Sequence, residues 1–379
     1  MATYLWQRPD WPTLLWKAEA LMEPLAAASR AQGRLYGELG ALGFEGDRQE
    51  AEAQALVEEA VTTSAIEGER LPREEVRSSV ARRLGLDAAG LRNPSRHVDG
   101  LVSMLLDATS RYDEPLTADR LKSWQAALFP TGYSGLAKIR VGQWREGPMS
   151  VLSGPVGRER EHFEAPPAER LDEEVARFLR WWEASWIGVV GLVRAGVAHL
   201  WFETIHPFDD GNGRVGRALT EMALAQADAR RRRFYSLSSQ IHRERDDYYR
   251  VLEAAQKGDG DVTEWLAWFL GCVLRAVEAA AEEVAKALER RRFWQSPSAR
   301  ELNARQVKAI SRLLDAGPGG FEGGLTNQKY RGMTKASKVT ATRDLADLLS
   351  RGLLLQSGQG RGTRYELNWT LLGGSKEHQ

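Results

Sequence analysis

The sequence predicts a mainly α-helical protein, and three observations support this prediction. Apolar residues recur at the three- and four-residue spacing of a helix through most of residues 10–290, with few alternating runs. One segment rich in glycine and proline, residues 141–167, interrupts that pattern. A short stretch at Trp294–Ser298 then precedes a smaller C-terminal unit. The 379 residues suffice for two or three domains with a sizeable hydrophobic core.

Composition excludes several classes of protein. Lysine plus arginine equals aspartate plus glutamate at 52 each, so overall charge indicates no acidic or basic partner. The single cysteine, Cys272, excludes an internal disulfide and lies in an apolar helical context typical of an inert thiol. The first residues lack a secretory signal pattern, and no apolar run approaches the roughly 20 residues that span a bilayer. We therefore expect a cytoplasmic protein without membrane contact.

Residues 1–95 are predicted to form an N-terminal helical region that supports the rest of the chain. The helical spacing continues over residues 96–292, which predicts a helical core there. Helices of this core are expected at residues 168–186, 188–205, 214–227, 246–256 and 262 to about 291. The many tryptophans of the core are interpreted as packing between helices.

Residues 141–167 break the helical pattern. Glycines and prolines flank the short apolar run Met149–Leu152, and the charged run Arg158–Glu161 follows it. Turn residues on either side of a short apolar run are typical of a β-hairpin. We therefore expect a hairpin here, with Arg158–Glu161 at its tip.

Residues 206–217 combine a tight turn with the start of a helix. An apolar helical run ends at Ile205, a turn follows at residues 209–213, and helical periodicity then resumes. A glycine-rich turn that opens a helix exposes backbone N–H groups at the positive end of the helix dipole. Such a turn is suited to binding an anion.

Four side chains in the same segment fit the chemistry of a phosphate ester. His206 is of the residue type whose pKa suits it to accept a proton from an attacking hydroxyl. Arg214 and Arg217 share a helix face, where two guanidinium groups would hold adjacent phosphates. Asp210 lies beside the turn, and Mg²⁺ prefers a carboxylate together with substrate phosphates. Each feature is common alone, but their combination within one short segment predicts phosphoryl or nucleotidyl transfer.

The segment resembles the motif of the Fic family. That motif is histidine, any residue, phenylalanine, any residue, an acid, Gly-Asn-Gly-Arg, two residues and arginine, and every defined position is filled here. The resemblance implies that AMP passes from ATP, with Mg²⁺, to a Ser, Thr or Tyr hydroxyl of a target protein, and that pyrophosphate leaves. The implied roles are general base for His206, core anchor for Phe208, Mg²⁺ ligand for Asp210, anion hole for Gly211, Asn212 and Gly213, inner-phosphate contact for Arg214 and γ-phosphate contact for Arg217.

Two further regions are similar to parts of Fic proteins. Residues 141–167 stand where Fic proteins carry a flap, which binds the target protein by strand addition. The stretch from Ser239 to Tyr249 is also similar, and Tyr249 would then support the adenine side of the nucleotide site. Packing between helices explains these tyrosines equally well, so both interpretations stay open.

Thr63–Gly68 resembles the inhibitory motif of Fic proteins, which is Ser or Thr, three residues, Glu, then Gly or Asn. Because it precedes residues 206–217, the chain is similar to the class with an N-terminal inhibitory helix. The Glu67 carboxylate would form a bidentate pair with Arg217 and block the productive position of ATP. The resemblance therefore implies autoinhibition by Glu67 and Thr63. In some family members the same glutamate also serves removal of AMP, which stays open here.

Residues 300–370 predict a winged helix-turn-helix domain, because three helical runs are followed by two β-like runs joined by a glycine-rich turn. Residues 301–379 carry an excess of five positive charges. A helix over residues 335–351 would be the recognition helix, with Arg361 and Arg364 on the wing. Form and charge favour DNA binding, and a protein-interaction module stays open.

Alternatives to AMP transfer also remain at this stage. The phosphate-binding turn contains nothing that reads a base, so another nucleotide donor fits it as well. A DNA-binding regulator with a nucleotide-sensing core would carry the same two domains. The sequence leaves the oligomeric state open and is compatible with a homodimer. A zinc site is disfavoured, because one cysteine and six scattered histidines show no ligand spacing.

Overall fold

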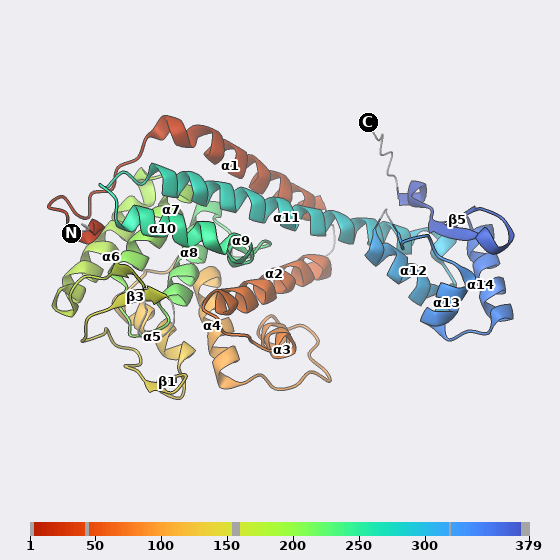
Figure 1. The fold of residues 1–379 in the computed structure, drawn as a ribbon, viewed down its shortest axis with the longest axis horizontal. Coiled ribbons are helices and arrows are strands. Elements are labelled where there is room, and N and C mark those ends of the chain that lie inside the picture. Colours follow the sequence, from red (N-terminus) through yellow and green to blue (C-terminus); the bar gives the residue numbers. More distant parts are fainter. Residues whose placement is uncertain (1–3, 42–44, 154–159, 318–319, 373–379) are drawn as a thin grey trace. The chain divides into compact units, whose positions relative to one another are not determined.

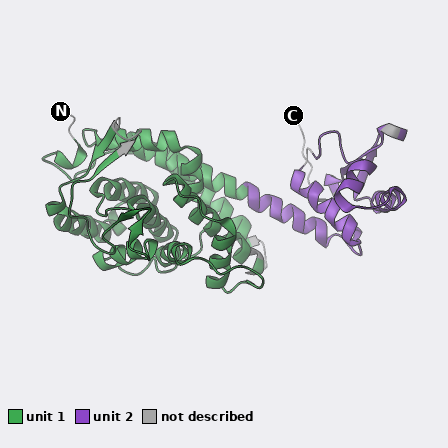
Figure 2. Cartoon of the chain, turned by 60° about the horizontal axis from the view of Figure 1, so that its bottom comes forward, with its two compact units in different colours: residues 1–281 green, residues 282–379 purple. Residues whose placement is uncertain are grey.

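The structure is a computed structural model and describes residues 4–41, 45–153, 160–317 and 320–372. The chain divides into two compact units, Met1–Ala281 and Glu282–Gln379 (Figure 2). The protein is mainly helical, as predicted, and its described strands form three antiparallel pairs. Among the described helices, none combines the length and the apolar character needed to cross a membrane.

Three helices open the first unit. They are α1 (Ala18–Ala41), α2 (Glu45–Ile66) and α3 (Arg73–Arg83). Helix α2 packs against α3 and against α9 (Leu237–Arg243). The chain leaves α2 through Gly68 at φ 82°, a conformation that glycine adopts without steric cost and that commonly follows the last turn of a helix. The predicted inhibitory motif therefore lies at the C-terminal end of α2.

The centre of the first unit is the pair α7 (Gly191–Ile205) and α8 (Asn212–Asp228), which pack against each other (Figure 1). Nearly every residue of α7 is buried, because this helix is apolar on all sides. The neighbouring helices are α4 (Arg96–Ser110), α5 (Ala118–Leu128), α6 (Leu171–Gly188), α10 (Arg245–Gln256) and α11 (Thr263–Gln295). Residues 206–217, which form the turn between α7 and the start of α8, therefore lie in the middle of the helical core.

Some predicted helix boundaries differ from the observed ones. Helix α8 begins before the predicted residue 214, because Gly211 at φ 88° already serves as its N-cap. Helix α9 was not predicted. Helix α11 continues to Gln295, so the first part of the predicted linker is helical, and the helix ends before Pro297, whose ring cannot continue it.

Residues 141–167 contain the predicted β-hairpin. Strand β3 (Ser150–Ser153) pairs antiparallel with β4 (Arg160–Glu164). The predicted charged tip needs a correction, because Arg160–Glu161 belongs to β4 and continues the strand ladder. The other half of that tip, Arg158–Glu159, lies outside the described residues.

Residues near the N-terminus brace strand β4. The indole N–H of Trp6 donates to the Glu164 carbonyl at 2.6 Å. The Tyr4 hydroxyl donates to the Glu161 carboxylate at 3.0 Å, and the Tyr4 ring packs edge-on against Phe163 with 5.3 Å between centroids. The N-terminal segment thereby holds the base of the hairpin, a role that its sequence did not indicate.

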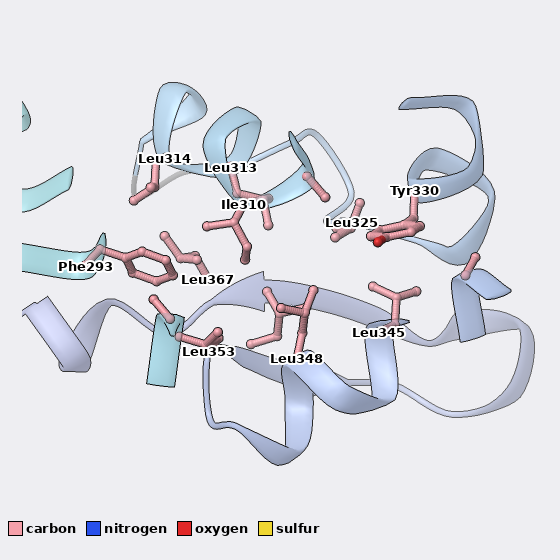
Figure 3. Packing of buried hydrophobic residues seen from close by; sticks show 14 residues of the cluster. Phe293, Ile310, Leu313, Leu314, Leu325, Tyr330, Leu345, Leu348, Leu353 and Leu367 are labelled. Atoms are coloured by element: carbon pink, nitrogen blue, oxygen red, sulfur yellow. The ribbon is translucent and has the colours of Figure 1, made fainter. Parts of the chain in front are cut away.

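After the end of α11, the described residues of the second unit form three short helices and a hairpin. They are α12 (Ala304–Ala316), α13 (Asn327–Thr334), α14 (Lys338–Ser350), β5 (Leu354–Ser357) and β6 (Arg364–Leu367). Their apolar side chains share one core, in which Ile310, Leu348 and Leu367 converge (Figure 3). Phe293, from the end of α11, is fully buried in this core (Figure 3).

The helix predicted for residues 335–351 begins later than expected. Lys335 adopts φ 59° at the C-terminal end of α13 and lies outside α14. The hydroxyl of Ser337 then accepts a hydrogen bond from the Thr340 N–H, which caps the start of α14. A left-handed residue followed by a serine cap separates the two helices.

Candidate active site at the α7–α8 turn

His206 ends α7 in a left-handed conformation, with φ 48° and ψ 59°. This region is uncommon for a residue other than glycine, and strained backbone clusters at functional sites. The ring Nδ1 lies 3.3 Å from the Glu203 carbonyl oxygen. Because a carbonyl only accepts hydrogen bonds, this contact favours the tautomer with the proton on Nδ1 and the lone pair on Nε2.

The ionisation of His206 follows from its burial. Burial lowers the pKa of His206 to about 4, so the imidazole is neutral at pH 7. A neutral imidazole with its lone pair on Nε2 is the form that accepts a proton from a hydroxyl. The site therefore holds this ring in a proton-accepting state.

The turn after His206 is closed by the side chain of Asn212. Its amide oxygen accepts from the Phe208 N–H at 2.9 Å, and its amide nitrogen donates to the Phe208 carbonyl at 2.8 Å. The Phe208 ring is fully buried, 4.9 Å from the Trp144 ring. Both ends of the Asn212 amide therefore hold the turn in shape.

Arg145 holds the same turn from outside and was not found by sequence reasoning. Its buried guanidinium donates to the carbonyls of His206 at 2.9 Å, Gly147 at 2.8 Å and Pro166 at 2.5 Å. Its backbone N–H donates to the Pro207 carbonyl at 2.9 Å. One side chain therefore joins the base of the β3–β4 hairpin to the main chain at His206.

Thr63 and Glu67 both contact Arg217, although they lie far from it in sequence. The Arg217 Nε donates to the Thr63 hydroxyl at 2.7 Å, and Nη2 donates to the Thr63 carbonyl at 2.9 Å and to Glu67 Oε1 at 2.6 Å. The expected bidentate pair is thus corrected to one carboxylate contact and two Thr63 contacts. Burial acts to raise the pKa of Glu67, but Arg217 holds it below its usual range.

Gly213 shows where the Glu67 carboxylate sits. A Cβ at Gly213 would lie 2.2 Å from Glu67 Oε1 and 3.0 Å from Arg217 Nη1, so any side chain would displace the carboxylate. Backbone at the first turn of a helix is also where an anionic ligand binds. The Glu67 carboxylate therefore occupies the position beside Gly213 and Arg217 that the motif predicts for a phosphate.

Arg214 faces a different set of groups. Its Nη1 donates to Glu69 Oε2 at 3.0 Å, and its Nη2 lies 3.6 Å from Asp210 Oδ1. The guanidinium also lies over the Phe129 ring, 5.0 Å from its centroid. Arg214 and Arg217 therefore meet separate carboxylates, although they emerge from the same helix.

Asp210 lies at the edge of the turn, where its side chain is partly exposed. One carboxylate oxygen accepts from the Ser134 hydroxyl, which lies on the unpredicted hairpin β1 (Tyr133–Ser134) and β2 (Ala137–Lys138). An accessible carboxylate beside a phosphate-binding turn fits Mg²⁺, which takes its other ligands from substrate phosphates and water. The described residues contain no cluster of three acidic, histidine or cysteine side chains that would hold a metal without the substrate.

Comparison with known families agrees with this geometry. The Fic/DOC family matches residues 115–224, which run from the start of α5 through most of α8. This chain contains a Fic/DOC domain. Members of that family generally transfer a nucleoside monophosphate to proteins. A second family, described as a domain of unknown function (DUF4172), matches residues 4–86, which include α2 and Glu67.

Solved structures of Fic proteins are similar in fold. A Fic family protein from Desulfovibrio desulfuricans G20 has a TM-score of 0.53 and 20% identity, over 95% of this chain and 97% of that one. A Fic domain containing signaling protein from Bacteroides thetaiotaomicron gives 0.51 and 17%, over 67% and 97%. A fragment of Fic-1 from C. elegans gives 0.50 and 19%, over 76% and 81%. At these identities the likeness extends to the fold alone.

Two neighbouring tyrosines of α10 have different surroundings. Tyr248 is buried, and its hydroxyl lies 2.9 Å from the Nε2 of the buried His199. Tyr249 is 38% exposed, and both Glu67 and Arg217 influence its pKa, which burial raises. Packing therefore explains Tyr248, whereas Tyr249 presents a ring at the edge of the site.

Glu203 lies behind His206 and was also missed by sequence reasoning. Its Oε2 is 3.7 Å from His206 Nδ1, and a Cβ at Gly216 would lie 2.4 Å from its Oε1. Burial raises the pKa of Glu203 to about 8, so the carboxyl is protonated at pH 7. The available signal was an acid in a mostly apolar helix, one turn before the motif histidine. No comparable signal marked Arg145.

Proposed function

We propose that this chain transfers AMP from ATP to a Ser, Thr or Tyr hydroxyl of a target protein. The main support is the position of His206 at the end of α7, in the turn that leads directly into the first turns of α8 with Arg214 and Arg217. The proposal divides the chain into a restraining region at residues 1–95, a catalytic core at residues 96–292 and a winged helix at residues 300–370.

The proposed step is an in-line displacement at the α-phosphate. His206 Nε2 takes the proton of the target hydroxyl while its oxygen forms a bond to the α-phosphorus. The bond from that phosphorus to the bridging oxygen breaks, and pyrophosphate leaves. Arg214, Arg217 and the backbone N–H groups at Gly211 to Gly213 hold the phosphates, so they stabilise charge that shifts toward the leaving group. The proton stays on His206, and the product carries AMP on the target oxygen.

Asp210 would hold Mg²⁺ in this site, and the bound ion would neutralise charge on the substrate phosphates. The Ser134 hydroxyl orients the same carboxylate, because it donates to one of its oxygens. In the proposal Tyr249 supports the adenine side, and the β3–β4 hairpin binds the target by strand addition. Arg145 supports that hairpin because it anchors both Gly147 and Pro166.

Glu67 restrains the reaction in this proposal. Its carboxylate contacts Arg217 and lies against Gly213, so a γ-phosphate and Glu67 compete for the same position. Thr63 strengthens the restraint, since its hydroxyl accepts a hydrogen bond from Arg217 Nε and its carbonyl accepts one from Arg217 Nη2. ATP then binds with Arg217 already occupied, and its α-phosphate is held away from the productive position.

Intact mass spectrometry tests the proposal. The protein is incubated with Mg²⁺ and each nucleoside triphosphate in turn, and we expect the mass of one adenylyl group to be added from ATP. His206→Ala should abolish this addition, whereas the matched control His242→Ala, at an exposed histidine, should leave it unchanged. Addition of a different nucleotidyl group would identify another nucleoside triphosphate, and not ATP, as the donor. No addition from any triphosphate, with the Glu67→Gly variant included, would overturn the proposal.

A second activity, DNA binding, is proposed for the C-terminal unit. Leu325 and Tyr365 exchange backbone hydrogen bonds of 2.9 and 2.8 Å, an isolated antiparallel bridge that ties the segment before α13 to the β5–β6 hairpin, an arrangement that fits a winged helix. Lys338, Thr342 and Arg343 are exposed at the start of α14. No acidic residue occurs between residues 335 and 343, so this face favours a phosphate backbone. Arg364 instead donates to the Gly323 carbonyl.

Fluorescence anisotropy with a labelled DNA duplex tests this second proposal. We expect salt-dependent binding, and Lys338→Ala combined with Arg343→Ala should weaken it and reduce the salt slope by about one for each lost phosphate contact. Arg312→Ala, on the exposed side of α12, is the control. Binding that is absent at low salt would contradict DNA contact and favour a protein-interaction module.

A further inference from the structure

The end of α2 brings a second carboxylate to the phosphate-binding residues. Glu69 lies two positions after Glu67 and is outside the inhibitory motif. Its Oε2 accepts from Arg214 Nη1 at 3.0 Å, while Glu67 accepts from Arg217. Each arginine of the Fic motif is therefore occupied by its own carboxylate.

The backbone after α2 fixes the two carboxylates together. The N–H groups of Glu67 and Glu69 both donate to the Ser64 carbonyl, at 3.1 and 3.0 Å. Gly68 between them takes φ 82°, which turns the chain sharply at this point. Because both N–H groups bond to one carbonyl, the backbone of both residues is held at the same helix end, from which each carboxylate reaches its own arginine.

Glu69 is held from its other side by His97, near the start of α4. The Nε2 of His97 lies 2.8 Å from Glu69 Oε1, and its Nδ1 lies 2.7 Å from the Leu128 carbonyl oxygen. Both ring nitrogens thus face acceptors, a setting that favours the doubly protonated imidazolium. Consistently, the Glu69 carboxylate raises the pKa of His97, and His97 holds the pKa of Glu69 below its usual range.

We propose that Glu69 is a second restraining carboxylate, which competes with the inner phosphates of ATP for Arg214 and is anchored by His97. This inference rests on the proposed function, in which Arg214 and Arg217 grip the triphosphate. A nucleotide that displaces only Glu67 can contact Arg217, but Glu69 still occupies Arg214. Full release of the site requires that the whole end of α2 withdraw, because Glu67 and Glu69 share one anchor at Ser64.

Calorimetric titration of ATP with Mg²⁺ into full-length protein tests the inference. His206→Ala is the background, so that binding is measured without turnover. We expect Glu69→Gln to tighten ATP binding by about tenfold, because a neutral amide competes weakly for a guanidinium. Glu67→Gln should also tighten it, and the double variant should exceed either. Glu74→Gln, an exposed acid on α3, removes the same charge and is the control for bulk electrostatics.

The outcomes separate this inference from the proposed function. Tighter binding in Glu67→Gln with no change or a loss in Glu69→Gln overturns the inference and leaves the proposed function intact, since Glu69 would then orient Arg214. An equal gain in Glu74→Gln also overturns it. Absence of ATP binding in every variant, the double variant included, overturns both. His97→Gln, measured in the same background, should loosen Glu69 and give part of the Glu69→Gln gain. Thermal unfolding of each variant verifies that the fold is kept.

Discussion

The segments at residues 63–69 and 206–217 meet at one site but differ in what they require of the fold. The later segment is nearly self-contained: Asn212 closes its turn and the start of α8 supplies its N–H groups. The earlier one is an ordinary helix end until the fold places its carboxylates on Arg214 and Arg217. The proposed chemistry can therefore be recognised in a short contiguous stretch of sequence, whereas the proposed restraint depends on contacts between segments far apart in sequence.

Arg145 tests how self-contained the later segment is, and we expect the largest effect there. Arg145→Lys replaces a planar fork by a single ammonium and leaves at least one of its buried carbonyl partners unpaired. Loss of buried hydrogen bonds of this kind costs about 3 kcal/mol of unfolding free energy. Urea unfolding measures it. A change below about 0.5 kcal/mol, the range of ordinary surface substitutions, would show that the turn holds its shape without Arg145.

Glu67→Gly tests the restraint itself. Removal of the carboxylate frees Arg217 Nη2 and the space beside Gly213, so self-modification with labelled ATP should rise by about tenfold, the equivalent of 1.4 kcal/mol. Glu67→Gln removes the negative charge without the added backbone flexibility of glycine at the end of α2. Comparison of the two variants therefore separates the effect of charge from the effect of flexibility. An unchanged rate in both variants would remove Glu67 from the mechanism of restraint.

Thr63→Val sharpens the same comparison with a smaller expected effect. The Arg217 Nε loses the hydroxyl acceptor, but the Thr63 carbonyl and Glu67 remain in place. A single hydrogen bond is worth about 1 kcal/mol, so self-modification should rise by no more than about fivefold. Thr62→Val, whose hydroxyl bonds only within α2, is the matched control. A gain larger than that of Glu67→Gly would make Thr63 the principal restraint.

The effect expected at Glu203 depends on pH. Burial raises the folded pKa of Glu203 to about 8, above the unfolded value near 4.5. Its contribution to stability is therefore full below pH 4.5 and is lost as pH rises through about 8. Glu203→Gln cannot ionise, so its melting temperature relative to wild type should increase between pH 5 and pH 9. A constant difference over that range would contradict a protonated Glu203.

Sequence patterns identified much of the fold because they depend on local rules. Helical spacing predicted the α6, α7, α10 and α11 segments, and turn residues predicted the β3–β4 hairpin. The sequence did not predict features of the fold that only a few residues determine. Lys335 ends α13 instead of starting α14, because a left-handed residue and the Ser337 cap separate the helices. The two-residue strands β1 and β2 are too short to produce a periodic signal.

The sequence alone predicted the turn at residues 206–217, because His206, the glycines and both arginines lie within one contiguous segment. Only the tertiary structure decided which carboxylate meets which arginine, and that burial keeps His206 neutral and Glu203 protonated. Pairings across about 150 residues and the dielectric environment of a side chain depend on how helices pack. Local periodicity carries no information about either, which is why Glu69 and His97 became visible only in the folded chain.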